Sequence, residues 1–243
     1  MISLFNTVLF EPLHNALAFL VAIIPGGDIG LAIIILTIIV KLILYPLTKR
    51  SIDSNRKMKL LEPELAKIKE EYKDKKEEQA KKTFELYKQN KINPFAGCLI
   101  ILIQLPIIIA LYYVFLKGLD FSSESLYSFV TAPTIIKTQF LGLVDMGSKS
   151  LILAILAGIT QYLQTALSMP KTKKEAKKDD SFSGSLKRSM DLQMRYFLPL
   201  FIGFVAFQVQ AAVALYWVTS NIFTIGQELY ARPWKISKEQ LKS

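Results

Sequence analysis

One lysine stands where a charged group is costly. Lys41 interrupts the apolar stretch IIILTIIVKLILYPL, about eight residues before Lys49, which puts it on the order of 12 Å below the end of a helix. Snorkelling covers only about half of that distance, and a charge in mid-span costs roughly 2.5–3.5 kcal/mol. No acidic residue stands deep in an expected span to pair with it. The sequence therefore predicts a water-filled, positively charged groove in the inner half of the bilayer.

Further polar residues are candidates for the lining of this groove. Thr37 precedes Lys41 by four residues, so a helix places both on one face. The other expected spans contribute Gln104, Gln161, Gln164, Ser220 and Asn221, with Gln227 close behind. A simpler alternative is that Lys41 snorkels and the glutamines only hydrogen-bond between helices, which is common in membrane proteins.

The same residues argue against an enzyme. The chain has no glycine-rich phosphate loop with a lysine, no HExxH motif and a single cysteine, Cys98. Its one histidine, His14, lies outside the expected spans, and a serine–lysine dyad would need a serine at the depth of Lys41. We therefore predict no catalytic residues, no metal and no cofactor.

Composition and hydropathy place these polar residues in membrane helices. Hydrophobic residues make up 51% of the 243-residue chain, mean hydropathy is +0.33, and the apolar residues form long runs. Runs of about 20 apolar residues cross a bilayer, and the long run near 196–230 fits two short spans. The sequence thus predicts an all-α integral membrane protein with five transmembrane helices, an N-terminal interfacial helix and a cytoplasmic helical hairpin.

The expected segments follow in order along one core domain. They are an N-terminal interfacial helix and turn at 1–28, span one at 29–48, a cytoplasmic helical hairpin at 49–93, span two at 94–117, an external loop at 118–148, span three at 149–169, a cytoplasmic basic loop at 170–194, span four at 195–209, span five at 211–230 and a cytoplasmic tail at 231–243.

The distribution of positive charge predicts the orientation. Of the 30 lysines and arginines, 26 fall in three segments that five spans place on one face of the membrane. Basic residues favour the cytoplasmic face. The sequence therefore predicts a multi-pass protein of a bacterial inner (plasma) membrane, with its N-terminus outside and its C-terminus in the cytoplasm.

Residues 2–24 are apolar but interrupted by polar residues, and only 16–24 is cleanly apolar. Nine residues are too few to span, so an interfacial helix on the outer surface is expected, with a sixth span as the alternative. His14 is expected at this wet interface.

The segment 56–91 is rich in lysine and glutamate and lacks glycine, which favours helix. Two apolar stripes run along it, and two antiparallel helices would let the stripes cover each other. The stripe residues are Leu61, Leu65, Ile68, Tyr72, Phe84 and Tyr87. A single long helix remains an alternative. Such a basic surface could also contact anionic lipid or ribosomal RNA.

Four stretches together resemble a known family. "LTIIVKLILYPLTKR", "NPFAGCLIILIQLPIIIALYYVF", "MRYFLPLF" and "ALYWVTSNIFTIGQ" resemble successive spans of the YidC-type membrane protein insertases of the Oxa superfamily. The resemblance covers nearly the whole chain and fits the compact five-span form, without a large external domain. Lysine stands where the family usually has arginine. Unlike guanidinium, an ammonium group can lose its proton when buried.

The resemblance implies a function as insertase and chaperone. The acidic tail of a nascent membrane protein would be drawn by Lys41, and its apolar segment would slide past Trp217 and Tyr216 into lipid, without nucleotide hydrolysis. The helical hairpin would recruit substrate, ribosome or the Sec translocon, and no specific DNA binding is expected. Two alternatives remain: a small polytopic transporter or channel, and a Sec-associated assembly subunit that does not insert.

Overall fold

The computed structural model describes residues 2–92, 96–116, 121, 126–168 and 192–231. Within these ranges the chain is almost entirely helical. The helices are α1 (Ile2–Phe5), η1 (Asn6–Phe10), α2 (Glu11–Ile23), α3 (Ile29–Ile43), α4 (Tyr45–Leu60), α5 (Glu62–Glu71), α6 (Lys76–Gln89), α7 (Ala96–Leu116), α8 (Leu151–Ser168), η3 (Gln193–Phe197), α10 (Leu198–Gln208) and α11 (Ala211–Ala231), and the two strands are β1 (Gln139–Phe140) and β2 (Val144–Asp145).

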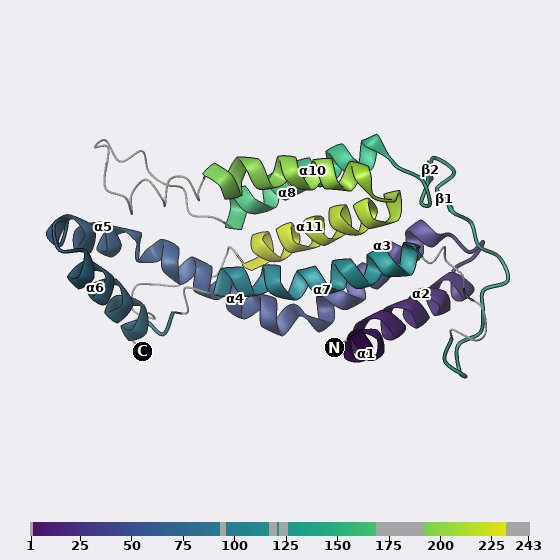
Figure 1. The fold of residues 1–243 in the computed structure, drawn as a ribbon, viewed down its shortest axis with the longest axis horizontal. Coiled ribbons are helices and arrows are strands. Elements are labelled where there is room, and N and C mark those ends of the chain that lie inside the picture. The colour runs from purple at the N-terminus through teal and green to yellow at the C-terminus, as the bar shows by residue number, and fades with distance from the viewer. Residues whose placement is uncertain (1, 93–95, 117–120, 122–125, 169–191, 232–243) are drawn as a thin grey trace.

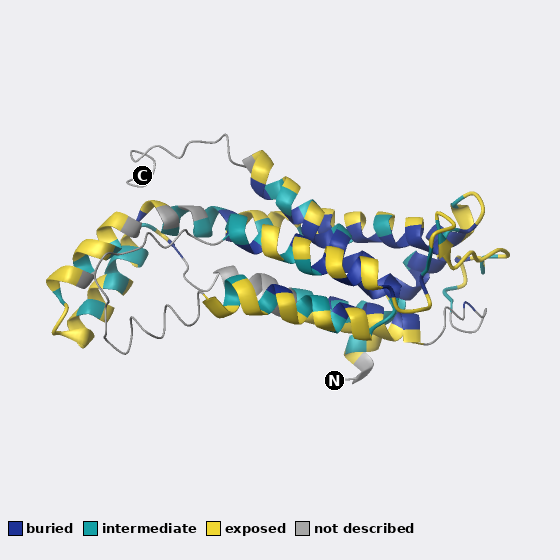
Figure 2. Cartoon of the chain, turned by 90° about the horizontal axis from the view of Figure 1, so that it is seen from above, coloured by how far each residue is buried: buried dark blue, intermediate teal, exposed yellow. Residues whose placement is uncertain are grey.

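The long helices form an elongated bundle (Figure 1). α11 runs through its middle and packs against α8 on one side and α3 on the other, while α10 covers α8. The first eight residues of α11, 211–218, are all buried, because helices enclose this end of α11 on several sides. Figure 2 shows the buried residues concentrated in this part of the bundle.

A bend separates α3 from α4. The two helices meet at an angle of 66°, and the break lies at Leu44, two residues before Pro46. Proline has no N–H to donate, and its ring clashes with the carbonyl group four residues earlier. The chain therefore leaves the axis of α3 just after Lys41, and α4 continues beyond the bundle.

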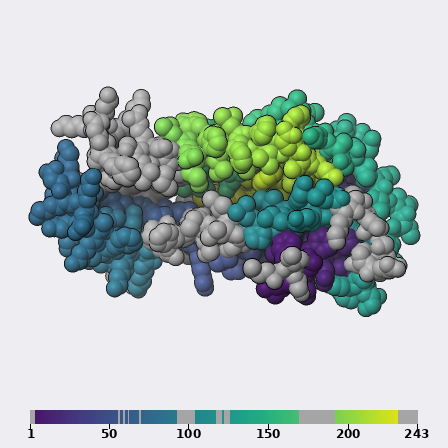
Figure 3. All heavy atoms as spheres, in the orientation of Figure 1, coloured from purple at the N-terminus to yellow at the C-terminus, as the bar shows by residue number. Residues whose placement is uncertain are grey.

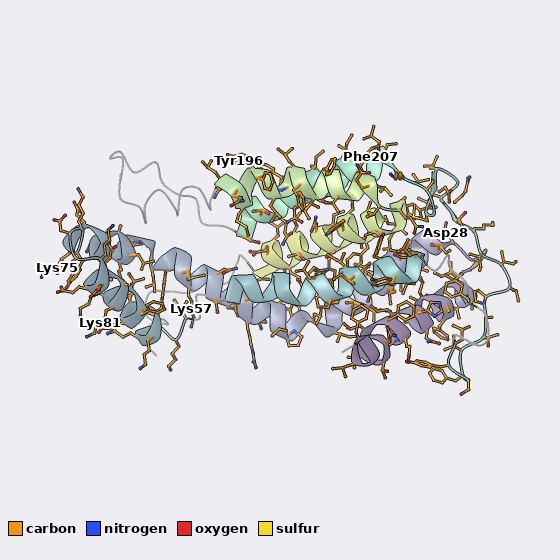
Figure 4. All side chains as sticks on the ribbon, in the orientation of Figure 1. Asp28, Lys57, Lys75, Lys81, Tyr196 and Phe207 are labelled. Carbon is orange, nitrogen blue, oxygen red and sulfur yellow. The ribbon has the colours of Figure 1, made fainter. Side chains whose placement is uncertain are left out.

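α4 carries a pair of helices at one end of the molecule. α5 and α6 pack against each other and lie apart from the main bundle (Figure 1). The turn between them contains Lys75, and Figure 4 shows this lysine at the far tip, with Lys81 further along the pair. The structure thus has the two-helix arrangement rather than the single long helix.

A two-stranded antiparallel hairpin lies at the opposite end. β1 pairs with β2 through Gln139–Asp145 and Phe140–Val144. The residues that follow β2 cap α11: the carbonyl oxygens of Ser148 and Met146 accept from the N–H groups of Ala211 (2.7 Å) and Ala212 (3.1 Å). These bonds satisfy two of the N–H groups that a helix leaves free at its start. We call this end of the molecule the β1–β2 end.

The number of membrane spans stays a prediction. By length and hydropathy, the described residues contain two helices that could cross a membrane, Asn6–Ile23 and Leu151–Ser168, or three if the bent pair Ile29–Ile43 and Tyr45–Asn55 is one span. The described apolar part of α7, Gln104–Leu116, is shorter, and α10 has only 11 residues.

The N-terminal helix differs from the sequence argument in two respects. Asn6–Ile23 is long and apolar enough to cross a membrane, so the short clean stretch does not exclude a sixth span. The expectation of a wet His14 is wrong: it is 3% exposed and stacks on Phe10, with Phe121 on another side. Neighbouring Asn15 accepts from the N–H of Tyr127 at 2.6 Å. Two of the polar residues that interrupt this apolar segment, His14 and Asn15, thus attach it to the rest of the protein.

Several predicted segments lie partly or wholly outside the described residues. These are most of the basic loop 170–194, nearly all of the tail 231–243 and much of the first part of the external loop.

Candidate functional site

Lys41 lies on α3, in its last turn, where α3, α7 and α11 meet. Its side chain is 5% exposed, and its Nζ donates to Gln104 Oε1 at 3.4 Å and to Thr224 Oγ1 at 3.3 Å. Both distances exceed the roughly 2.7–2.9 Å typical of hydrogen bonds from a charged donor. Two acceptors also use only two of the three N–H groups of an ammonium. The site therefore holds the cation loosely.

The two acceptors are oriented by further bonds. The amide nitrogen of Gln104 donates to the hydroxyl of Tyr216, which directs its oxygen toward Lys41. Thr224 donates its hydroxyl proton to the carbonyl oxygen of Ser220 at 2.9 Å, so its lone pairs face Lys41. Both of these acceptors of the cation are neutral, and within the described part of the chain Lys41 forms no ion pair.

Thr37 lies one turn from Lys41 on α3, as predicted, but its hydroxyl is already used. It is 1% exposed and donates to the carbonyl oxygen of Ile33 at 2.6 Å. Back-bonding of this kind is an ordinary way to satisfy a threonine inside a helix.

A second polar cluster joins α8 to α11. Asn221 donates to Thr160 Oγ1 at 3.2 Å. Nearer the other end of α8, Ser168 donates to Glu228 Oε1 at 3.0 Å. These bonds cross between α8 and α11, which pack against each other, and Asn221, Thr160 and Glu228 are all buried.

Two predicted glutamines bond along α8 itself. Gln161 donates to Gln164 Oε1 and to Thr165 Oγ1, both at 3.3 Å. The hydrogen bonds thus link Lys41 to Gln104 and, through Thr224, to the carbonyl group of Ser220. Asn221 bonds separately to Thr160 of α8, whereas the two bonds that Gln161 donates stay within α8.

The expected slide residues do not lie on an outer surface. Tyr216 is 1% exposed and Trp217 is 8% exposed, and their role in a slide stays a prediction. They fall in the enclosed first half of α11, where an apolar face meets other helices rather than lipid. The exposed apolar surface near Lys41 instead comes from α3, where Ile39, Leu42 and Ile43 are 42–70% exposed.

Sequence reasoning missed Thr224 as a site residue, and it missed the burial of Glu228. Ser220 follows Tyr216 by four residues and Thr224 follows Ser220 by four, so the three residues lie along one side of α11. That spacing could have identified Thr224 as a partner of Lys41. Glu228 was counted with the charges of the tail, but it is 6% exposed.

Gln227 is a separate feature of the same helix. Both polar atoms of its amide are buried, and neither has a hydrogen-bond partner among the residues that the structure describes. It follows Ser220 by seven residues, so it lies on nearly the same face of α11, beyond Thr224.

The predicted recruitment residues are only partly covered. Leu61 is buried, whereas Leu65, Ile68, Tyr72 and Tyr87 are half-buried. Phe84 is 60% exposed, so the idea that the two stripes cover each other is wrong there. Partial burial raises the pKa of Tyr87 above its ordinary value. Lys82 and Glu85 pair on the open side of α6 at 2.8 Å.

Comparison with known proteins identifies the family. The model of the 60Kd inner membrane protein family matches residues 20–239. The chain belongs to this family. The resemblance seen in the sequence is thereby confirmed, and the protein is an integral membrane protein.

Named relatives agree with the family. The chain is 33% identical over 232 residues to the membrane protein insertase YidC of Oceanobacillus iheyensis, covering 93% of this chain and 83% of the relative. It is 35% identical over 208 residues to YidC of Clostridium tetani, with 86% and 83% covered. Against YidC of Francisella tularensis subsp. novicida, the identity is 33% over 228 residues, but only 36% of that longer protein is covered. These relatives are named insertases rather than enzymes.

A solved structure supports the fold. The crystal structure of an active YidC insertase, with its first transmembrane domain resolved, superposes with a TM-score of 0.55 at 24% identity. The match covers 94% of this chain and 46% of that one. At this identity the likeness concerns the fold alone.

Proposed function

We propose that this member of the insertase family moves short hydrophilic tails of nascent membrane proteins into the bilayer by attracting them to Lys41. The observation that carries the proposal is a buried ammonium held only by neutral acceptors at long distances. An incoming carboxylate offers the close, charge-assisted hydrogen bonds that Gln104 and Thr224 do not. It would also neutralise a charge that is costly to hold in a membrane.

The apolar part of the substrate would then move along exposed apolar surface into lipid. The exposed isoleucines and leucine of α3 lie close to Lys41 in the sequence and provide such a surface. Burial of an apolar span is strongly favourable, at about 0.8 kcal/mol for each CH₂ group. Transfer would therefore need no nucleotide, because the barrier lies in desolvating the tail and the cation lowers it.

The predicted groove, orientation and partners belong to the same proposal. Lys41 would be reached from the cytoplasm through a polar groove, with the N-terminus of the protein outside. α5 and α6, with exposed lysines such as Lys75 and Lys81, would meet the ribosome, the substrate or the Sec translocon.

Insertion with purified components tests the proposal. Liposomes containing only this protein receive a single-span substrate with a short acidic tail, and protease protection is measured against empty liposomes. We expect Lys41→Arg to retain insertion and Lys41→Ala to lower it by roughly tenfold, the ratio that about 1.4 kcal/mol represents. Lys41→Arg, which keeps a positive charge at the same position, is the matched control for Lys41→Ala.

The substrate supplies a second control. When the acidic residues of its tail are replaced by amides, Lys41→Ala should lower insertion far less. Equal insertion by all variants would reject the role of the charge. No protection above empty liposomes, with folded protein, would favour an assembly subunit that does not insert.

A further inference from the structure

The tip of the β1–β2 hairpin presents two leucines to the surroundings. Leu141 is 63% exposed and Leu143 is 84% exposed, with Gly142 between them. We call these two side chains the leucine tip. In Figures 1 and 3 the segment that contains it forms one extreme of the molecule, opposite α5 and α6.

The backbone of the tip is unfavourable for leucine. Leu141 has φ +52° and Gly142 has φ +71°. Hairpin turns with two such residues favour asparagine, aspartate or glycine at the first, because a β-carbon in this region crowds the carbonyl oxygen. Burial in the core does not offset the strain at Leu141, because this side chain is exposed. Strain of this kind points to a use outside the fold.

The strained turn is held by an acidic residue. The carboxylate of Asp28 accepts from the N–H of Leu141 at 3.2 Å with one oxygen and from the N–H of Leu31 at 3.0 Å with the other. Asp28 is the N-cap of α3, so one side chain joins the tip to the start of that helix. Figure 4 shows Asp28 at this end of the bundle.

Two further contacts fix the hairpin. The ring of Phe140 packs against Gly30 so closely that no side chain would fit at that position. The carbonyl oxygens of Met146 and Ser148 cap α11. The leucines therefore project from a base that is attached to both α3 and α11.

The surroundings of the tip indicate which partner covers it. Exposed apolar surface continues at the start of α8, where Leu151 is 60% and Ile152 is 66% exposed, and α8 is long and apolar enough to cross a membrane. Lys137 and Lys149 are exposed on either side of the hairpin. Leucines between lysines suit the boundary between lipid headgroups and acyl chains, because the ammonium groups reach the phosphates.

A protein partner fits this tip less well. Stable protein interfaces bury roughly 1,200–2,000 Å², which two side chains on a turn do not approach. A lipid bilayer can take up two exposed leucines without a complementary surface of that size.

We propose that the leucine tip is an interfacial membrane anchor, which inserts Leu141 and Leu143 into the headgroup–acyl boundary of the leaflet at the β1–β2 end. The hairpin also holds the first turns of the two helices that supply Lys41 and Thr224. The anchor therefore sets the depth of Lys41 in the bilayer. This consequence for depth rests on the proposed function, whereas the anchoring itself does not.

Spin labelling tests the anchor directly. Cys98 is the only cysteine, so Cys98→Ser provides a background for single labels in the full chain. Labels at Leu143, Asp74 and Ile155 are compared in liposomes of phosphatidylcholine and phosphatidylglycerol. Asp74 is the exposed aqueous reference between α5 and α6, and Ile155 is the reference on the exposed apolar face of α8.

Collision rates with oxygen and with a water-soluble nickel chelate then report depth. We expect the label at Leu143 to collide with the chelate at least threefold less than the label at Asp74, and with oxygen more. A label at Leu143 that matches Asp74 would overturn the anchor. So would one that is shielded only after another protein is added.

A second variant tests whether the spin label itself draws the tip into the membrane. Leu141→Asn suits the left-handed backbone and removes half of the leucine tip. We expect a higher melting temperature in detergent and at least a twofold rise in chelate collisions at Leu143. An unchanged depth would contradict the proposal. Depth is measured without any substrate, so a buried tip in a protein that fails to insert substrates would count against the proposed function alone.

Discussion

At the scale of residues, the site depends on which atoms remain available around Lys41. Gln104 and Thr224 direct lone pairs at the ammonium because their own protons are used elsewhere. The arrangement stabilises a buried cation without neutralising it. A carboxylate added at the same place should therefore compete with the substrate.

Gln104→Glu tests this competition. The new carboxylate would stand where the amide oxygen now lies, 3.4 Å from Nζ, and would pair with Lys41. We expect a folded protein in which insertion of an acidic-tailed substrate falls by roughly tenfold, while a neutral-tailed substrate is much less affected. Proteoliposome insertion measures both. Gln161→Glu, on α8 and away from the hydrogen bonds of Lys41, is the control, and equal losses in the two variants would contradict the idea.

The native Gln227 side chain is expected to lower the free energy of unfolding. Its amide is buried without a hydrogen-bond partner in the described part of the chain, and an unsatisfied polar group costs about 1–3 kcal/mol. We expect Gln227→Leu to raise the free energy of unfolding in detergent by about that amount. Gln161→Leu, which removes two hydrogen bonds, should not stabilise the protein. Destabilisation by Gln227→Leu would show that the amide has a partner in solution.

At the scale of elements, α11 organises the bundle because its polar residues face two ways. One face meets α3 and α7 through Thr224 and Tyr216, and another meets α8 through Asn221 and Glu228. The apolar residues between them are enclosed, so α11 is held more by its neighbours than by lipid. α10 packs against α8, and the two helices are in close contact at a pair of glycines.

Gly158 of α8 and Gly203 of α10 form that contact. A β-carbon at Gly158 would lie 3.3 Å from the carbonyl oxygen of Pro199 and 3.6 Å from the Cα of Gly203. We expect Gly158→Leu to push the helices apart and to lower the free energy of unfolding by about 1–3 kcal/mol, the usual cost of overpacking. Thermal unfolding in detergent is the measurement.

A third glycine offers a matched control. A β-carbon at Gly226, within α11, would have no neighbour within 4 Å. Gly226→Ala should raise stability by roughly 0.5–1 kcal/mol, because alanine loses less backbone entropy in a helix. If Gly158→Leu were as harmless as Gly226→Ala, close packing of α8 on α10 would be refuted.

At the scale of the whole molecule, the protein has a bundle and an appendage. α5 and α6 contact each other and the end of α4, whereas the Lys41 site lies within the bundle. The two parts are joined by helix rather than by a shared core. We therefore expect the bundle to determine thermal stability and the appendage to determine recruitment.

Replacement of residues 62–90 by a short Gly–Ser linker tests this separation. We expect the melting temperature of the bundle in detergent to change by no more than a few degrees. Insertion of a substrate delivered by a ribosome should fall more than insertion of a free peptide. A large loss of thermal stability would show that the appendage is part of the folding core.

Much of the site could be anticipated from the sequence because membrane burial makes polar residues conspicuous. A lysine within an apolar run, with Gln104 in another run, identified both partners of one hydrogen bond. The i, i+4 spacing also placed Thr37 correctly beside Lys41. The division of the polar residues between two faces of α11 could not be foreseen, since helix periodicity does not say which neighbour each face meets.

By itself, the sequence determined that this chain is helical and membrane-embedded, that it belongs to the insertase family, and that it carries an unpaired cation among apolar residues. These properties depend on composition and on local spacing, which need no knowledge of distant contacts. Only the tertiary structure decided that Trp217 and Tyr216 are enclosed, that His14 is buried, and that Thr224 completes the site. Burial and hydrogen bonding depend on which segments, far apart in sequence, pack together.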